Sequence, residues 1–137
     1  MTLKTTVLIV DDDSNLRKLL RMSLENSHRV IHEAATAEEG LRLALDTVPD
    51  VLLLDIGLPG LDGFALFQAM DGESALGNMK TVIITGHDAA EDISQAERFG
   101  IDVYLIKPFS PRTVVELVER LEPKRYEMLV VPAERHD

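Results

Sequence analysis

Short apolar stretches of strand length alternate along the chain with longer stretches whose apolar residues recur every three or four positions. The apolar stretches are residues 5–10, 29–34, 50–55, 81–85 and 101–106. Because a helical pattern separates each strand from the next, the strands are expected to run parallel, with a helix in each connection. The pattern therefore predicts an α/β protein with a doubly wound, five-stranded parallel sheet and helices on both faces.

Start signals and apolar positions define the helices of this pattern. Thr36 followed by Glu39 predicts a capping box, and Ser110 followed by Pro111 is typical of a helix start. Other predictions are a cap at Asp88, a helix over residues 63–70 and a loop over residues 71–80. The residues expected to face the core from the helices are Leu16, Leu19, Leu20, Leu24, Leu41, Ala44, Leu45, Val48, Ile93, Ala96, Phe99, Val114, Leu117, Val118 and Leu121.

Polar side chains stand where four of the five predicted strands end. They are Asp11 and Asp12 after the first strand, Asp55 after the third, Thr85 after the fourth and Lys107 after the fifth. In doubly wound sheets, ligands bind beyond the carboxyl ends of the strands, where the strand order reverses. We therefore expect these ends to form one site. Strand 29–34 ends in alanine, which is explained if this strand lies at an edge of the sheet, away from the point of reversal.

Three consecutive carboxylates, Asp11 to Asp13, follow the first strand. Like charges this close repel each other, and the repulsion grows in low-dielectric surroundings unless a cation compensates it. One interpretation is a cation site. The other is a solvated turn, because Asp is common in turns and at helix starts. For Asp13 the second interpretation is favoured, as a cap of the first helix shared with Ser14.

Composition narrows the classes of function. A chain of 137 residues with 45% hydrophobic residues is most simply one globular domain. Its formal net charge of −10 opposes docking on nucleic acid or on an anionic membrane, and favours cations and proteins as partners. The absence of cysteine, of a signal-peptide core and of a membrane-span segment predicts a cytoplasmic protein. The four histidines lack the spacing of metal ligands.

Four motifs resemble those of the receiver domains of two-component response regulators. They are VLIVDDD, LLLDIGLPGLDG, VIITG and YLIKPF, and the resemblance extends over residues 5–121. Each motif contains a polar strand end of the predicted site. The resemblance implies a flavodoxin-like fold with the strand order 2-1-3-4-5.

The resemblance also implies a role for several single residues. Asp55 corresponds to the phosphoacceptor, and Thr85 and Lys107 correspond to the hydroxyl and ammonium groups that bind the phosphoryl oxygens. Tyr104 corresponds to the aromatic residue that moves together with Thr85 when the domain switches; the alternative is a fixed strand tyrosine. The peptide between Lys107 and Pro108 corresponds to one that is commonly cis in the family.

A magnesium site is the expected cofactor site. Clustered carboxylates offer the hard oxygen ligands that Mg²⁺ prefers. By the resemblance, Asp12, Asp55 and the main-chain carbonyl of Gly57 hold the ion directly, and Asp11 acts through water. Such an ion would also compensate the repulsion among the carboxylates.

The implied function is that of a signalling phosphoacceptor rather than an enzyme, with Mg²⁺-dependent autophosphorylation and slow autodephosphorylation as its only chemistry. The phosphoryl donor is expected to be a sensor histidine kinase or a histidine phosphotransfer protein, and the output partner is unknown. One alternative is a degenerate receiver that only docks partners. Another is an aspartyl-phosphate phosphatase of the haloacid dehalogenase type, which needs an acidic residue where Gly57 stands.

The periodic pattern ends near Leu121. We expect residues 1–122 to form the domain and residues 123–137 to be a tail or a truncated linker. The alternative is that the apolar residues 128–131 pack on this domain or on a neighbour.

Overall fold

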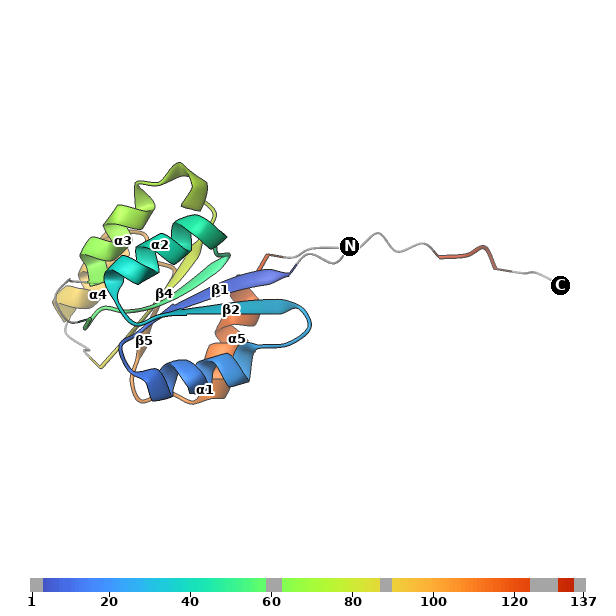
Figure 1. Cartoon of the computed structure of the whole chain (residues 1–137), viewed down its shortest axis with the longest axis horizontal. Helices are drawn as coiled ribbons and strands as arrows, with labels where there is room; N and C mark the ends of the chain where they lie inside the picture. The colour runs from blue at the N-terminus through green and yellow to red at the C-terminus, as the bar shows by residue number, and fades with distance from the viewer. Residues whose placement is uncertain (1–3, 59–62, 87–89, 124–130, 135–137) are drawn as a thin grey trace.

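The computed structural model describes residues 4–58, 63–86, 90–123 and 131–134, in which strands and helices alternate (Figure 1). The strands are β1 (Thr5–Val10), β2 (Arg29–Ala34), β3 (Val51–Asp55), β4 (Lys80–Thr85) and β5 (Val103–Ile106). The helices are α1 (Ser14–Leu24), α2 (Ala37–Thr47), α3 (Gly63–Asp71), α4 (Ala90–Arg98) and α5 (Pro111–Leu121), with a short 3₁₀ helix, η1 (Ser74–Leu76).

The strands form one parallel sheet in the order β2-β1-β3-β4-β5. This confirms the predicted fold class and strand order. After β1 the chain turns outward to β2, and it then returns across β1 to β3 and continues in the opposite direction. The strand order thus reverses between β1 and β3, and the carboxyl ends of these two strands flank the crevice in which such sheets bind ligands.

Two layers of helices cover the sheet. Helices α2, α3 and α4 lie on one face, and α1 and α5 lie on the other (Figure 1). The central strand β3 is buried along its whole length, with Leu52 and Leu54 in the first core and Val51 and Leu53 in the second. Burial on both faces explains its continuous apolar sequence, and each fully buried leucine stabilises the fold by about 2 kcal/mol.

Local signals begin three of the helices as predicted. The carboxylate of Asp13 accepts hydrogen bonds from the backbone N–H groups of Asn15 (3.0 Å) and Leu16 (3.2 Å) at the start of α1. The hydroxyls of Thr36 and Ser110 each accept a backbone N–H three residues later, at the starts of α2 and α5. Such caps contribute about 1 kcal/mol each. The expected cap at Asp88 lies outside the described residues.

Two strands begin later than the sequence predicts. Asp50 and Asp102 precede β3 and β5 instead of opening them, and their side chains bond to the neighbouring strands. Oδ2 of Asp50 accepts the N–H of Thr6 at 2.8 Å, and Oδ2 of Asp102 accepts the N–H of Thr81 at 2.9 Å. These aspartates satisfy backbone donors at the end of the sheet opposite the crevice.

Three residues that were expected to face the core are largely exposed instead. Leu19 is 45% exposed and Leu45 is 42% exposed, because each lies at the edge of the apolar stripe of its helix. Val48 is 47% exposed and follows the end of α2 with a left-handed φ of 47°. A β-branched residue rarely adopts this conformation, which here ends the helix before Pro49.

The segment predicted as loop over residues 71–80 contains η1, whose Leu76 is buried in the core beside α2 and α3. On the same side of the sheet, Phe99 packs its ring against Phe64 and Phe67, with ring centroids 5.7 and 6.2 Å apart. These contacts anchor the end of α4 to α3. Within the described part of the chain, no helix has the length and apolar character needed to cross a membrane.

Candidate functional site

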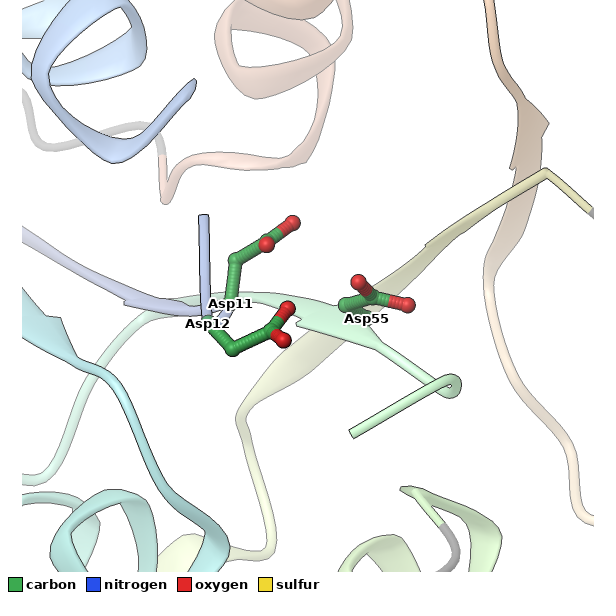
Figure 2. Close-up of side chains that lie close together, drawn as sticks. All are labelled: Asp11, Asp12 and Asp55. Atoms are coloured by element: carbon green, nitrogen blue, oxygen red, sulfur yellow. The ribbon is translucent and has the colours of Figure 1, made fainter. Parts of the chain in front are cut away.

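Three carboxylates meet at the point where the strand order reverses. Asp11 and Asp12 follow β1, and Asp55 is the last residue of β3, the strand paired with β1. Figure 2 shows the three side chains converging, and one oxygen from each lies within 4.8 Å of the others. Adjacent parallel strands end at the same edge of a sheet, which is why residues 44 positions apart come together here.

Burial makes this cluster electrostatically unfavourable without a cation. The side chains of Asp11 and Asp55 are 3% and 10% exposed, whereas Asp12 lies exposed at the rim. Burial raises the pKa of the Asp11 carboxyl above its ordinary value, and the charge of Asp55 adds to the rise, against the opposing effects of the Asp13 N–H and of Lys107. A set of oxygen ligands with this much negative charge suits a hard divalent cation such as Mg²⁺.

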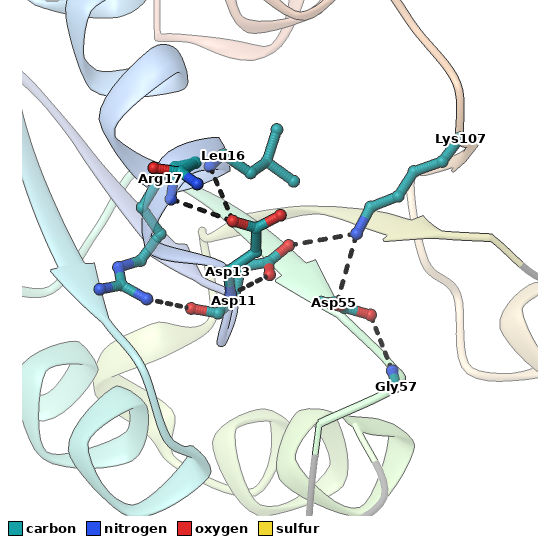
Figure 3. A network of polar contacts seen from close by, with 8 residues as sticks. Asp11, Asp13, Leu16, Arg17, Asp55, Gly57 and Lys107 are labelled. Atoms are coloured by element: carbon teal, nitrogen blue, oxygen red, sulfur yellow. Dashed lines mark hydrogen bonds and ion pairs between the residues drawn. The ribbon is translucent and has the colours of Figure 1, made fainter.

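Lys107 provides a positive charge from the far side of the site. Its Nζ lies 3.5 Å from Oδ2 of Asp11 and 3.5 Å from Oδ2 of Asp55 (Figure 3). The backbone N–H of Lys107 donates to the carbonyl of Thr85 at 2.7 Å, which continues the pairing of β4 with β5. The peptide between Lys107 and Pro108 is cis.

The backbone after β3 is folded closely around Asp55. The N–H of Gly57 donates to Oδ1 of Asp55 at 2.8 Å, and a Cβ at Gly57 would lie 3.3 Å from the same oxygen (Figure 3). A Cβ at Gly63 would lie only 2.5 Å from the Cα of Ile56, so α3 can begin here only with a glycine. Pro59 and Gly60, which come between Gly57 and Gly63 in the sequence, lie outside the described residues.

Thr85 and Tyr104 lie on neighbouring strands. Thr85 ends β4 with 1% exposure, and it follows Ile84, the register partner of Asp55. Tyr104 is opposite Ile83 in β5 and packs partly buried against the core under α2, α3 and α4. Since side chains alternate along a strand, Thr85 points to the same face of the sheet as Ile83 and Tyr104.

The structure adds a residue that the sequence reasoning missed. Arg17 in α1 donates from Nη1 to the main-chain carbonyl of Asp11 at 2.7 Å and pairs through Nε with Glu33 of β2. The available signal was an arginine one helical turn after the capping Asp13. His28 is exposed and His32 is half-buried, and His87 and His136 lie outside the described residues. Among the residues described, the three aspartates are the one group of acidic and histidine side chains clustered closely enough for a metal.

Comparison with known proteins identifies the family. The sequence profile of the response regulator receiver domain matches residues 7–119. The chain belongs to this family. As a receiver domain, it is a signalling phosphoacceptor domain of two-component systems and not a member of a catalytic enzyme family. Its acidic pocket corresponds to the pocket in which receiver domains bind Mg²⁺.

Curated relatives and solved structures agree with this assignment. The receiver domain is 37% identical over 122 residues to the transcriptional regulatory protein ResD of Bacillus subtilis, covering 88% of this chain and 49% of ResD. It is 36% identical over 132 residues to the transcriptional regulatory protein SrrA of Staphylococcus aureus, covering 95% of this chain and 53% of SrrA. The chain thus spans about half the length of these relatives.

A solved CheY-like receiver domain from Methanospirillum hungatei superposes on this receiver domain with a TM-score of 0.79 at 30% identity. The superposition covers 85% of this chain and 92% of that structure. The similarity in fold therefore agrees with the similarity in sequence, and both identify the receiver-domain family.

Proposed function

We propose that this receiver domain accepts a phosphoryl group on Asp55 from a sensor histidine kinase or a histidine phosphotransfer protein, and that the modified domain changes its affinity for an output partner. The observation that carries the proposal is the arrangement at the sheet edge. Asp55 lies between two further carboxylates and the ammonium of Lys107, which is 3.5 Å from its Oδ2. This arrangement suits a carboxylate that attacks phosphorus and afterwards bears additional negative charge.

The transfer step exchanges one bond to phosphorus for another. A carboxylate oxygen of Asp55 forms the new P–O bond while the P–N bond to the donor imidazole breaks, and the electron pair of that bond stays on the imidazole nitrogen, which takes up a proton. Lys107 would stay close to the phosphoryl oxygens as the bonds change, and the hydroxyl of Thr85 would donate to one of them.

We place Mg²⁺ in this site, held by Asp12, Asp55 and the carbonyl of Gly57, with Asp11 acting through water. The donor set supports this, because Mg²⁺ prefers oxygen ligands and one carboxylate oxygen from each of Asp11, Asp12 and Asp55 lies within 4.8 Å of the others. When bound, the ion would neutralise charge on the transferring phosphoryl group. The chain's own groups orient the nucleophile: the Gly57 N–H holds Oδ1 of Asp55 at 2.8 Å.

Phosphorylation is proposed to act on the fold through Thr85 and Tyr104. New phosphoryl oxygens on Asp55 would draw the Thr85 hydroxyl toward them, and the space it leaves would admit the ring of Tyr104. Their positions on one face of β4 and β5 support this coupling. Helix α4, strand β5 and helix α5 would then form the surface whose partner affinity changes.

The proposed signalling unit is residues 1–122, and residues 123–137 form a tail or linker. Its partners are proteins, with neither nucleic acid nor membrane contacted directly, which agrees with a net charge of −10. A reducing compartment such as the cytoplasm agrees with the absence of cysteine. The proposed output partner is a separate protein or an effector domain.

Phosphorylation by a small acyl phosphate with Mg²⁺, followed by intact-mass measurement, tests the proposal. We expect one acid-stable, alkali-labile phosphoryl group on the parent and none on Asp55→Asn, which removes the nucleophilic charge at nearly constant size. An unlabelled parent would indicate a receiver that only docks partners, and rapid continuous hydrolysis of the donor would indicate a phosphatase. Stable labelling of Asp55→Asn would place the acceptor elsewhere.

A further inference from the structure

Arg17 joins three parts of the chain beside the acidic site. Its Nη1 donates to the main-chain carbonyl of Asp11 at 2.7 Å, and its Nε lies 3.3 Å from Oε1 of Glu33 in β2. The second carboxylate oxygen of Glu33 binds Nε of Arg21, one turn further along α1. The Arg17 side chain is only 16% exposed, so water competes weakly for these bonds.

These bonds restrict the backbone of Asp11 on both sides. The N–H of Asp11 donates to the carbonyl of Ala34 at the end of β2 (3.1 Å), and the carbonyl of Asp11 accepts from Arg17. Oδ1 of Asp11 also accepts the N–H of Asp13 at 2.9 Å. The peptide that links Asp11 to Asp12 therefore cannot rotate unless the bond to Arg17 breaks, and the orientation of this peptide sets where the Asp12 carboxylate lies.

Arg17 approaches this peptide from the side opposite the site. Figure 3 shows its guanidinium group beyond the backbone of Asp11, whereas Lys107 and Asp55 lie on the other side. Lys107 therefore supplies positive charge inside the site, whereas Arg17 binds the backbone of Asp11 on the side that faces away from the site. Arg21 has the same charge and shares Glu33 with Arg17, but its guanidinium group donates to the carboxylates of Glu33 and Glu25.

We propose that Arg17 is a positioning residue for the cation site: its bond to the Asp11 carbonyl, braced by Glu33, holds the Asp11–Asp12 peptide in the orientation that presents both carboxylates to a divalent cation. The inference rests on the proposed function, because it assumes that Mg²⁺ binds at Asp12 and Asp55. Contacts of this kind behind metal ligands typically change metal affinity about 10-fold to 100-fold when they are removed.

The experiment compares Arg17→Met with Arg21→Met, which removes an equal charge from the same cluster without touching Asp11. Mg²⁺ affinity is measured by calorimetry at a temperature where both variants are folded, and the Asp12 amide is followed by NMR without metal. In Arg17→Met we expect a Kd for Mg²⁺ about 10-fold higher than that of the parent, together with a shifted Asp12 amide signal. In Arg21→Met we expect the Kd and the Asp12 amide signal to equal those of the parent. At saturating Mg²⁺, the rate of labelling by the acyl phosphate should return to that of the parent.

Arg17→Lys covers the case in which Arg17→Met does not fold. A lysine keeps the charge and one donor but cannot bind the Asp11 carbonyl and Glu33 together, so we expect a Kd between those of the parent and Arg17→Met. A parent-like Kd and Asp12 amide in the folded Arg17 variants would overturn the inference, and so would equal losses in Arg17→Met and Arg21→Met. A parent that neither binds Mg²⁺ nor becomes labelled would instead refute the proposed function, and the inference with it.

Discussion

The guanidinium group of Arg29 forms a two-point ion pair with the carboxylate of Glu122, in which Nε and Nη2 each lie 3.1 Å from a different oxygen. This pair joins the first residue of β2 to the residue that caps the end of α5. Nη1 of Arg29 also donates to the carbonyl of Leu24 at the end of α1, at 3.3 Å. A cation is favourable at both helix ends because the helix dipoles are negative there. Arg29 thus links the ends of α1 and α5 to β2, the strand at one edge of the sheet.

Removing one partner of this pair should destabilise the domain. Glu122→Ala would leave the guanidinium of Arg29, which is 7% exposed, without its carboxylate. We expect the free energy of unfolding in urea to fall by about 2–3 kcal/mol, less than for a fully buried pair because Glu122 is 25% exposed. Glu116→Ala is the control, since its partner Arg112 is 88% exposed and the loss should be about 0.5 kcal/mol or less. Equal losses in the two variants would contradict the prediction.

Magnesium should stabilise the folded domain through Asp12. A ligand that binds only the folded state adds about 2.7 kcal/mol at a concentration 100 times its Kd, and Asp12→Ala should remove most of this gain. Thermal melting with and without Mg²⁺ measures the effect. Asp13→Ser is the control, because Asp13 caps α1 and serine also caps helices well. A melting response that survives in Asp12→Ala would place the cation elsewhere.

The stability of the metal-free protein should depend on the protonation of Asp11. Because its pKa is raised above the ordinary 3.8, the folded state binds this proton more tightly than the unfolded chain. The Asp11 carboxyl therefore adds most to the free energy of unfolding at acidic pH, where it is protonated. This stabilisation is lost as the pH rises through the raised pKa. Without Mg²⁺, Asp11→Asn should melt at a higher temperature than the parent at neutral pH.

The difference in melting temperature between Asp11→Asn and the parent should become smaller as the pH falls toward the ordinary carboxyl pKa of 3.8. Melting curves across this range test the prediction, with Asp46→Asn as a control for loss of an exposed carboxylate on α2. A constant difference between Asp11→Asn and the parent at all pH values would argue against a buried, proton-linked Asp11.

The lifetime of the phosphorylated protein should depend on the residue at position 57. Gly57 offers no side chain to orient water, and a Cβ there would lie 3.3 Å from Oδ1 of Asp55. We expect Gly57→Asn to change the rate of phosphoryl loss, measured by intact mass over time, while phosphorylation still occurs. Gly86→Asn is the control, because a Cβ at Gly86 meets nothing within 4 Å. Decay at the parental rate in Gly57→Asn would show that position 57 does not control access of water.

The coupling of Thr85 to Tyr104 can be followed by amide spectra. A beryllofluoride mimic of the phosphoryl group should shift amides across α4, β5 and α5, and Thr85→Ala should confine the shifts to the loop around Asp55. Thr81→Ala is the control: it removes a hydroxyl on the same strand and face that is buried without a hydrogen-bond partner. Shifts that cross the whole surface in Thr85→Ala would show that the signal takes another route.

The sequence by itself determined the features that depend on neighbouring residues. Capping by Asp13, Thr36 and Ser110 joins groups two or three residues apart, and apolar periodicity marks the strands within a few residues of their ends. The polar ends of four strands, together with the predicted parallel order, were enough to anticipate that Asp11, Asp12 and Asp55 would meet. These inferences succeed because each parallel strand carries its last residue to the same edge.

Only the tertiary structure decided which distant groups pair. Arg29 and Glu122 are 93 positions apart, and Arg17 reaches Glu33 and the Asp11 backbone. The residues around these two arginines do not show that Arg29 pairs with Glu122 or that Arg17 pairs with Glu33, because an arginine occurs both on solvated helix faces and against buried acceptors. The choice depends on how helices and sheet edges pack against one another, and that packing is a property of the whole chain.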